Sequence, residues 1–243
     1  MFEDSLRNKI ILIVGGALGI GRATTRLCAE RGATVIIADL DTTAGAQTAE
    51  ETNGLFIPVN ITEEAQVAAM AQKVADTYGR VDVLIQTAGI LQGAFVSLDE
   101  FGVETFRRVL EVNVLGTFLV VKHITPLLKK SAKGVVILTS SGAATGGSSS
   151  FAYGTSKGGV NSFAVTLTNR LEPEGIRVNI LSPGNIDTGM KRSVIAADAV
   201  KRGLDFENAV VDSKLGTPEG VARVLAWLAS DEADYVRGVI TTR

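Results

Sequence analysis

The chain has 243 residues, 46% of them hydrophobic, and a formal net charge of −2 with charges of both signs interspersed. This length and apolar content suffice for one large domain, and we expect a single domain over residues 1–243 because no linker, repeat or low-complexity tract divides the chain. The balanced charge excludes the basic surface that a nucleic-acid partner would need.

Short apolar runs rich in β-branched residues recur along the chain. Because each run is apolar throughout rather than alternating, it is typical of a parallel strand covered on both faces. The runs are Ile10–Val14, Thr34–Ala38, Leu55–Val59, Val81–Ile85, Val135–Thr139 and Arg177–Leu181.

Longer segments with one apolar face separate these runs and predict helices. The clearest faces consist of Val67, Met70, Ala71 and Val74; of Val160, Phe163, Ala164, Leu167 and Leu171; and of Val221, Val224, Leu225 and Leu228. Strands that alternate with helices through right-handed crossovers predict a doubly wound α/β domain.

The segment "ILIVGGALGIGRA", residues 11–23, predicts a phosphate-binding turn between a strand and a helix. Gly15 allows the tight turn, Gly19 lets a pyrophosphate approach the backbone, and Gly21 lets the helix pack closely. The spacing, G-x-x-x-G-x-G, differs from the G-x-G-x-x-G form, and glycine also serves ordinary tight turns.

Asp39 ends the second predicted strand, about where an acidic residue reaches the adenosine ribose of a dinucleotide. The alternative role is a helix N-cap, for which Asp41 is better suited. A carboxylate would repel a 2′-phosphate, and neither the glycine turn nor Leu40 supplies a cation, so we expect NAD. Arg22 lies near enough to keep NADP open.

The segment "SFAYGTSKGGV" places Tyr153 and Lys157 four residues apart, on one face of a helix. An ammonium close to a phenol favours the phenolate, and should lower the tyrosine pKa from about 10. The pair can then serve as a general acid/base. The same spacing also occurs on ordinary surface helices.

Together the motifs resemble the short-chain dehydrogenase/reductase family over nearly the whole chain. The matching pieces are "GGALGIG", "TAG" at 87–89, "NVLGTF" at 113–118, "TSS" at 139–141, "YGTSK" at 153–157 and "NILSPGNIDT" at 179–188. The resemblance implies a three-layer Rossmann-like αβα domain with six or seven strands in the order 3-2-1-4-5-6-7. It also implies reversible hydride transfer between a nicotinamide and an alcohol or carbonyl.

The resemblance assigns catalytic roles to four residues. Tyr153 is the acid/base, Lys157 lowers its pKa and holds the nicotinamide ribose, and Asn113 maintains a water-linked proton path to the lysine. A serine binds the substrate oxygen. Counting from Gly134 selects Ser141, the family's usual interval before the tyrosine selects Ser140, and we choose Ser141 because loops absorb length changes.

By the same resemblance, cofactor-binding residues lie at the ends of several strands. They are Gly15, Leu18, Gly19, Ile20, Gly21, Asp39, Leu40, Asn60, Ile61, Ala88, Gly89, Tyr153, Lys157, Pro183, Gly184, Ile186 and Thr188.

Three departures from the family pattern concern supporting contacts: Val14 replaces Thr, Asn60 replaces Asp, and "QTAG" replaces Asn-Asn-Ala-Gly. We expect the side-chain oxygen of Asn60 to accept from the adenine amine, with the Ile61 amide also available. Thr87 keeps only a hydroxyl, so the tie across the central strands is open to change.

The segment Gly189–Lys214 should form the substrate lid, since it mixes apolar residues with cations and fits an amphipathic helix over a pocket. We interpret its charges as a solvated face. His123, the only histidine, should have no chemical role, and a single histidine argues against a metal site. A possible seventh strand begins in "GVITTR", whose short length leaves the sheet edge and one oligomer interface open.

Three features predict a cytoplasmic protein without a membrane partner. The single cysteine, Cys28, cannot form an internal disulfide; no apolar run approaches ~18 residues; and Met1–Asp4 is acidic where a signal peptide would be basic.

We therefore expect an NAD-dependent oxidoreductase acting on a small alcohol or carbonyl compound. A homodimer or homotetramer should form through the long helices near 102–130 and 154–172. The alternatives are a nicotinamide-sensing binding protein that has lost catalysis, and a methyltransferase using S-adenosylmethionine, for which Tyr153 and Lys157 would have no purpose.

Overall fold

A computed structural model describes residues 4–242; Met1–Glu3, part of the acidic N-terminal sequence considered above, and Arg243 lie outside the described residues. The chain forms one parallel sheet in the order β3-β2-β1-β4-β5-β6-β7, which confirms the expected topology. The strands are β1 (Ile10–Val14), β2 (Thr34–Asp39), β3 (Leu55–Pro58), β4 (Val83–Gln86), β5 (Gly134–Thr139), β6 (Ile176–Ser182) and β7 (Gly238–Thr241). The seventh strand is thus present and pairs in parallel with β6.

The strand boundaries follow the apolar runs to within two residues. The largest difference is at Val81, which precedes β4 and donates its amide to Leu127 rather than to a strand. The neighbouring Asp82 instead accepts the amide of Ile10 at 2.8 Å, so a side chain joins the starts of β4 and β1.

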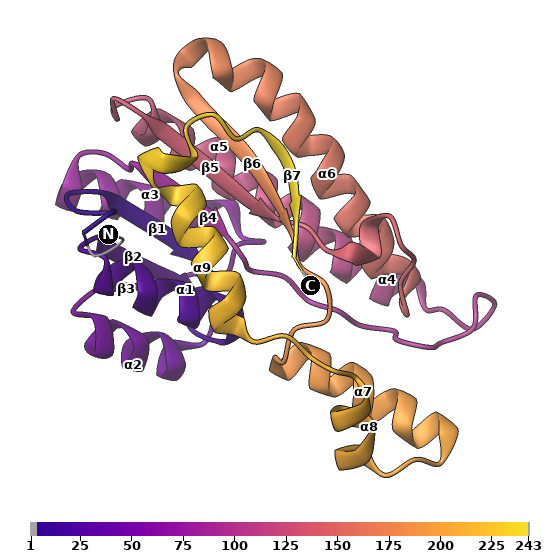
Figure 1. Cartoon of the computed structure of the whole chain (residues 1–243). Helices are drawn as coiled ribbons and strands as arrows, with labels where there is room; N and C mark the ends of the chain where they lie inside the picture. The colour runs from indigo at the N-terminus through magenta and orange to yellow at the C-terminus, as the bar shows by residue number, and fades with distance from the viewer. Residues whose placement is uncertain (1–3, 243) are drawn as a thin grey trace.

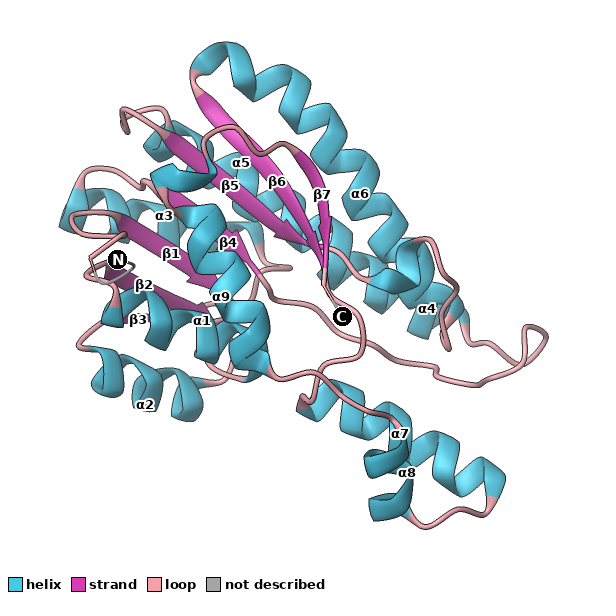
Figure 2. Cartoon of the chain, viewed as in Figure 1, coloured by secondary structure: helices cyan, strands magenta, loops and turns pink. Residues whose placement is uncertain are grey.

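Helices cover both faces of the sheet (Figure 2). The helices are α1 (Gly19–Glu30), α2 (Thr42–Thr52), α3 (Glu64–Tyr78), α4 (Val103–Leu110), α5 (Thr117–Leu128), α6 (Phe151–Leu171), α7 (Gly189–Arg202), α8 (Phe206–Asp212) and α9 (Pro218–Ala229). Alternate residues of each strand face opposite layers: Leu12 packs in the core with α3, α5 and α6, whereas Ile11 packs with α1 and α9.

Helices α4 and α5 form one continuous helical run, Val103–Leu128. Between them, residues Glu111–Gly116 take the wider π-helical form. By length and composition this run could cross a membrane, but half of its apolar stretch is buried inside the fold, as in a core helix.

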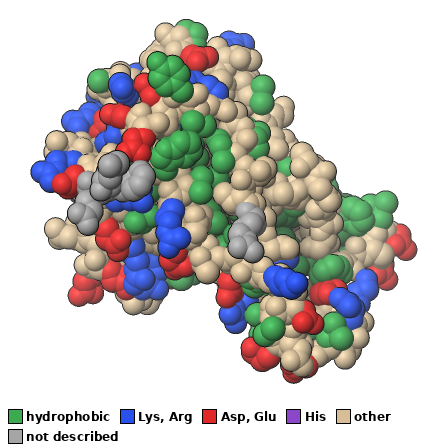
Figure 3. All heavy atoms as spheres, viewed as in Figure 1, with side chains coloured by type: hydrophobic (Ala, Val, Ile, Leu, Met, Phe, Trp, Pro, Cys, Tyr) green, Lys and Arg blue, Asp and Glu red, His purple; other side chains and the backbone are tan. Residues whose placement is uncertain are grey.

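The α7–α8 pair projects from the sheet body near the carboxyl ends of the strands (Figure 1). An isolated bridge between Ile186 and Gly216 closes the base of this excursion. Figure 3 shows apolar, basic and acidic side chains mixed over the visible surface of the α7–α8 pair, without a cluster of charges of one sign.

Candidate active site

A cavity of about 830 Å³ opens at the carboxyl ends of the strands. This is where an open α/β sheet binds its ligands, and the volume suits an extended small molecule. Every residue expected to bind the cofactor lines this cavity, and so does Ser141. Asn113 is the one expected site residue that does not line the cavity.

The glycine turn between β1 and α1 has no room for side chains. A Cβ added to Gly15, whose φ is +82°, would lie 2.4 Å from the Ala88 nitrogen, and one added to Gly21 would lie 1.8 Å from the Gly15 oxygen. Within residues 4–242 the amides of Gly19, Ile20 and Gly21 have no acceptor, as is usual for the first turn of a helix. These amides and the positive end of the α1 dipole therefore suit an anionic group.

Asp39 stands at the opposite end of the cavity from Tyr153. Its carboxylate accepts the Ala17 amide at 3.0 Å, which joins β2 to the glycine turn, and the Asp41 amide at 3.1 Å, just after β2. Asp41 caps α2 by accepting the Ala44 amide at 2.9 Å, so the capping role belongs to Asp41 as expected. Arg22 pairs with Glu51 and does not line the cavity.

At Asn60 the side-chain oxygen that we expected to contact adenine already has partners within the chain. The side-chain oxygen of Asn60 already accepts the amide of Thr62 (3.2 Å) and its hydroxyl (2.9 Å). Because an amide N–H can face only the oxygen, the amide group of Asn60 cannot be flipped, and its nitrogen is the atom left for a ligand. The amide of Ile61 has no partner among residues 4–242 and is free to donate.

The altered "QTAG" segment keeps its structural connections. The Thr87 hydroxyl donates to the carbonyls of Val14 (2.9 Å) or Gly15 (3.1 Å), so it ties the ends of β4 and β1. Gln86 is buried and donates to the Thr117 hydroxyl at 3.1 Å. The connection between the central strands, which the sequence left open, is therefore made by the Thr87 hydroxyl.

Tyr153 and Ser141 face each other in the cavity. Both residues line the cavity, and the Ser141 hydroxyl is close enough to the Tyr153 phenol to influence its pKa; Ser141 also accepts the Ala143 amide at 3.2 Å. Ser140 also borders the cavity, but it is buried and its hydroxyl donates to the Lys157 carbonyl at 3.2 Å. The Ser140 hydroxyl therefore has a partner within the fold, and we keep Ser141 as the candidate to contact a ligand.

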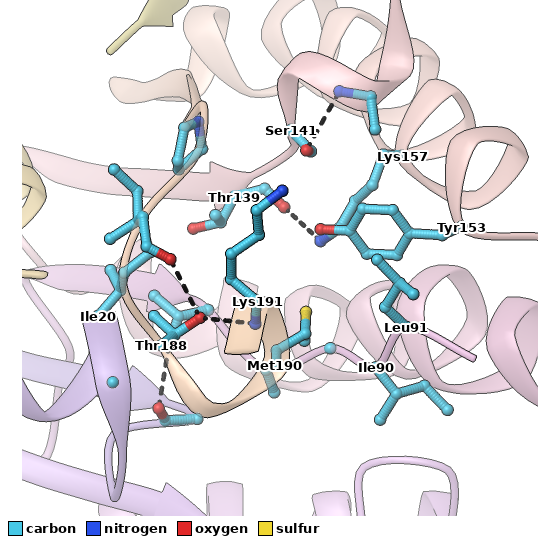
Figure 4. Close-up of a pocket in the computed structure, with 18 of the residues that line it drawn as sticks. Ile20, Ile90, Leu91, Thr139, Ser141, Tyr153, Lys157, Thr188, Met190 and Lys191 are labelled. Atoms are coloured by element: carbon cyan, nitrogen blue, oxygen red, sulfur yellow. Dashed lines mark hydrogen bonds between the residues drawn. The ribbon is translucent and has the colours of Figure 1, made fainter. Parts of the chain in front are cut away.

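Lys157 lies beside Tyr153, with its ammonium 5.7 Å from the ring centroid (Figure 4). The ammonium donates to the Thr139 carbonyl at 2.8 Å, and burial without an acidic neighbour lowers the lysine pKa to about 8.

The pKa of Tyr153 differs from the expectation. Burial of the phenol raises its pKa, and the nearby Ser141 hydroxyl only partly opposes this. The direction is therefore opposite to the lowering expected from Lys157: burial of the phenol dominates, and the Lys157 ammonium donates to the Thr139 carbonyl.

Asn113 lies in the π-helical turn and positions the cavity wall from behind. Its side-chain oxygen accepts the Ile90 amide (2.8 Å), and its side-chain nitrogen donates to the Ile90 carbonyl and to the Ser156 hydroxyl (both 2.9 Å). Its carbonyl accepts the Thr117 hydroxyl at 2.7 Å. A Cβ on Gly89 would lie 3.1 Å from the Asn113 side-chain oxygen and 3.4 Å from the Lys157 nitrogen, so these two residues meet around Gly89.

The segment after β6 contributes one residue that the sequence analysis missed. Thr188 caps α7 by accepting the Lys191 amide at 3.2 Å, and Lys191 lines the cavity rather than a solvated face. Figure 4 shows the Lys191 side chain extending into the cavity toward Thr139. In the sequence, the only indication that Lys191 lies near the site is its position one helical turn after Thr188.

His123 lies away from the site. It contacts Glu64 at 3.0 Å on the outer face of α5. Residues 4–242 contain no cluster of three histidine, cysteine or acidic side chains that could hold a metal.

Comparisons with known proteins agree with this geometry. A family model described as "Enoyl-(Acyl carrier protein) reductase" matches residues 15–242. "Tropinone reductase-like 2" of Erythroxylum coca is 37% identical, covering 96% of this chain and 88% of that protein. "Cis-4-hydroxycyclohexanecarboxylate dehydrogenase" of Sinomonas cyclohexanicum is 33% identical, covering 98% and 95%.

Two solved structures also share the fold. A 3-ketoacyl-(acyl-carrier-protein) reductase from Brucella melitensis, complexed with NADH, superposes with a TM-score of 0.87 at 26% identity, covering 98% of this chain and 97% of that one. A chain described as a short-chain dehydrogenase from Shigella flexneri, complexed with NADP, gives 0.86 at 26% identity, covering 98% of each. These matches leave no place for a methyltransferase: the chain belongs to the short-chain dehydrogenase/reductase family of oxidoreductases.

Proposed function

We propose that this oxidoreductase uses NAD to transfer hydride between the nicotinamide and a secondary alcohol or ketone. One observation carries the proposal: Ser141, Tyr153 and Lys157 converge at one end of a cavity whose other end is formed by the glycine turn and Asp39. The free first-turn amides, the turn without space for side chains and the Asp39 carboxylate fit a dinucleotide. When bound, the nicotinamide supplies or accepts the hydride.

The residues of the site then handle the proton. Ser141 holds the substrate oxygen next to the Tyr153 hydroxyl, and a neutral phenol is the form that donates a proton to a carbonyl being reduced. Because burial raises the pKa of Tyr153, this form dominates at neutral pH. In the oxidative direction the phenolate accepts the proton, and Ser141 and the Lys157 ammonium stabilise that anion.

NAD rather than NADP is supported by the charge at the ribose end. Asp39 lines the cavity, while Arg22, the nearest candidate cation in the sequence, is held by Glu51. A 2′-phosphate placed there would meet a carboxylate without a compensating cation. The neighbours' cofactors, NADH in one and NADP in the other, allow either choice.

For the substrate we propose a ring or chain alcohol covered by residues 189–214 acting as the lid. Met190 and Val194 of α7 and Leu91 and Phe95 of the facing loop supply an apolar lining. The compounds in the names of two relatives reported above, tropinone and cis-4-hydroxycyclohexanecarboxylate, carry an oxygen on a ring. A ring compound of this kind fits such a lining.

We further propose a cytoplasmic homodimer or homotetramer formed through α4, α5 and α6. These helices expose Val103, Leu115, Phe118 and Val165, which are 43–62% accessible. Apolar side chains gathered on neighbouring helices are typical of an interface. Light scattering of a Phe118→Glu, Val165→Glu variant should give a smaller species than the parent chain.

The test of function is a panel of ring and chain alcohols and ketones, followed by NADH absorbance. Turnover with NAD, much weaker turnover with NADP, and saturation in the alcohol are the expected results. Tight NADH binding with no turnover of any compound would instead favour the nicotinamide-sensing alternative.

A further inference from the structure

The Lys191 ammonium is a half-buried cation directed into the active-site cavity. Within residues 4–242 no carboxylate lies within ion-pair distance of it. The acid that acts on it electrostatically is Asp198, two turns further along α7, and Asp198 itself pairs with Arg202 at 3.2 Å. Burial accordingly lowers the lysine pKa, with Asp198 opposing this only in part.

The other charged residues of the cavity already have roles. Asp39 holds two backbone amides at the far end, Arg108 pairs with Glu111 at 2.8 Å, and Lys157 donates to the Thr139 carbonyl. Lys191 makes no comparable contact. A desolvated ammonium without a counter-ion is costly, so a ligand that brings an anion gains more here than at a surface lysine.

A bound ligand could bring that anion from two sources, the cofactor pyrophosphate or a carboxylate of the substrate. The free amides of Gly19, Ile20 and Gly21, at the positive end of α1, already suit the pyrophosphate. Lys191 instead lies beside Met190 and extends toward the Tyr153 end of the cavity, where Leu91 also points (Figure 4). This placement favours the substrate.

We propose that Lys191 binds a carboxylate of the substrate, so that the preferred substrates are hydroxy acids and keto acids with an apolar carbon frame. The inference rests on the proposed function and narrows its substrate class. The carboxylate is held by Lys191 while the reacting oxygen lies at Ser141 and Tyr153, so only compounds with both groups use the whole cavity.

The experiment compares 4-hydroxycyclohexanecarboxylate with 4-hydroxycyclohexanecarboxamide, which match in shape and differ in charge. The parent enzyme should prefer the carboxylate in kcat/KM by about ten- to a hundredfold, the range expected for a hydrogen bond to a charged group. Lys191→Met should remove this preference, mainly by raising KM for the carboxylate, and Lys191→Arg should keep most of it. The control Arg192→Met removes a neighbouring cation that pairs with Asp187 outside the cavity, and should leave the preference unchanged.

Two results would overturn the inference: equal use of acid and amide by the parent enzyme, or a preference that survives Lys191→Met. A Lys191→Met variant that binds NADH more weakly and loses activity equally on both compounds would assign the cation to the pyrophosphate instead.

A binding measurement separates this inference from the proposed function. Cyclohexanecarboxylate and cyclohexanecarboxamide are titrated calorimetrically into the NADH complex of the parent and Lys191→Met proteins. Lysine-dependent binding of the acid supports the inference even if no alcohol is oxidised, whereas absence of turnover counts only against the proposed function. Equal binding of the acid and the amide to the parent protein would contradict the proposed role of Lys191 and would leave the proposed function untouched.

Discussion

The two ends of the cavity are built in different ways. The β1–α1 end is formed mainly by backbone atoms, because Gly15 and Gly21 lie against neighbouring main chain. Hydrogen bonds of Asp39 and Thr87 connect this turn to β2 and β4. The α7–α8 end is formed mainly by side chains: Met190, Lys191 and Val194 line the cavity. The bridge between Ile186 and Gly216 lies where this segment leaves and rejoins the sheet body.

This difference separates what is general from what is particular. A dinucleotide is recognised by amides and a carboxylate that the sheet fixes in place, so changes there affect packing first. Substrate choice depends on side chains that can be exchanged without disturbing the sheet, and Lys191 is the clearest example. Substitutions at the two ends should therefore fail in different ways.

The largest contrast is expected between two glycine-to-alanine changes. Gly21→Ala places a Cβ 1.8 Å from the Gly15 oxygen, whereas Gly189 at the start of α7 has nothing within 4 Å of a Cβ. We expect Gly21→Ala to abolish measurable NADH binding and to lower the free energy of unfolding by about 1–3 kcal/mol. Gly189→Ala should bind NADH normally; fluorescence titration and urea unfolding check both, and equal behaviour would break the comparison.

The next contrast is between neighbouring serines. Ser141→Ala removes the hydroxyl that faces Tyr153, and should lower kcat by about a hundredfold, as loss of one donor to the reacting oxygen does elsewhere. Ser140→Ala removes a bond to the Lys157 carbonyl, and should cost about 1 kcal/mol of stability with little change in kcat. Steady-state kinetics and unfolding of both variants decide; the reverse pattern would make Ser140 the substrate contact.

A smaller effect concerns Lys157 and pH. Its pKa is lowered to about 8 in the folded protein, so the unfolded chain binds more protons above that pH, and stability should rise as pH increases. Between about pH 7 and about pH 9 the rise should be on the order of 1 kcal/mol, and it should be missing in Lys157→Met. Urea unfolding of both proteins across this range gives the difference; parallel curves would show that the ammonium is not desolvated.

The smallest effect should come from the ribose end. Asp39→Asn keeps an acceptor and removes the charge, so the preference for NAD over NADP should fall, by about tenfold or less because the site is open to water. Asp41→Asn is the matched control, since asparagine caps a helix as well as aspartate. Binding constants for both cofactors test this, and an unchanged ratio in Asp39→Asn would remove Asp39 from cofactor choice.

Much of the fold follows from sequence because strands buried on both faces are continuous apolar runs, as at Ile10–Val14. The π-helical turn at Glu111–Gly116 has no such pattern, since it depends on how the segment between α4 and α5 packs against α6, as in the Asn113–Ser156 hydrogen bond. That the proposed cofactor residues line one cavity was predictable, because they follow the carboxyl ends of parallel strands, which meet at one edge of the sheet.

Contacts that depend on side-chain direction were not predictable. The sequence alone does not show that Thr62 occupies the Asn60 oxygen, that Lys191 points inward, or that burial raises the pKa of Tyr153. Each depends on how neighbouring elements pack rather than on local spacing.

The central claim is that the Tyr153 hydroxyl moves the proton. Tyr153→Phe keeps the ring that packs beside Lys157 and removes only this group, so we expect NADH affinity within about twofold of the parent and a fall in kcat of about a thousandfold or more. Stopped-flow measurement of NADH consumption on a saturating ketone tests it most directly. Turnover near the parent rate, with NADH bound normally, would contradict the account.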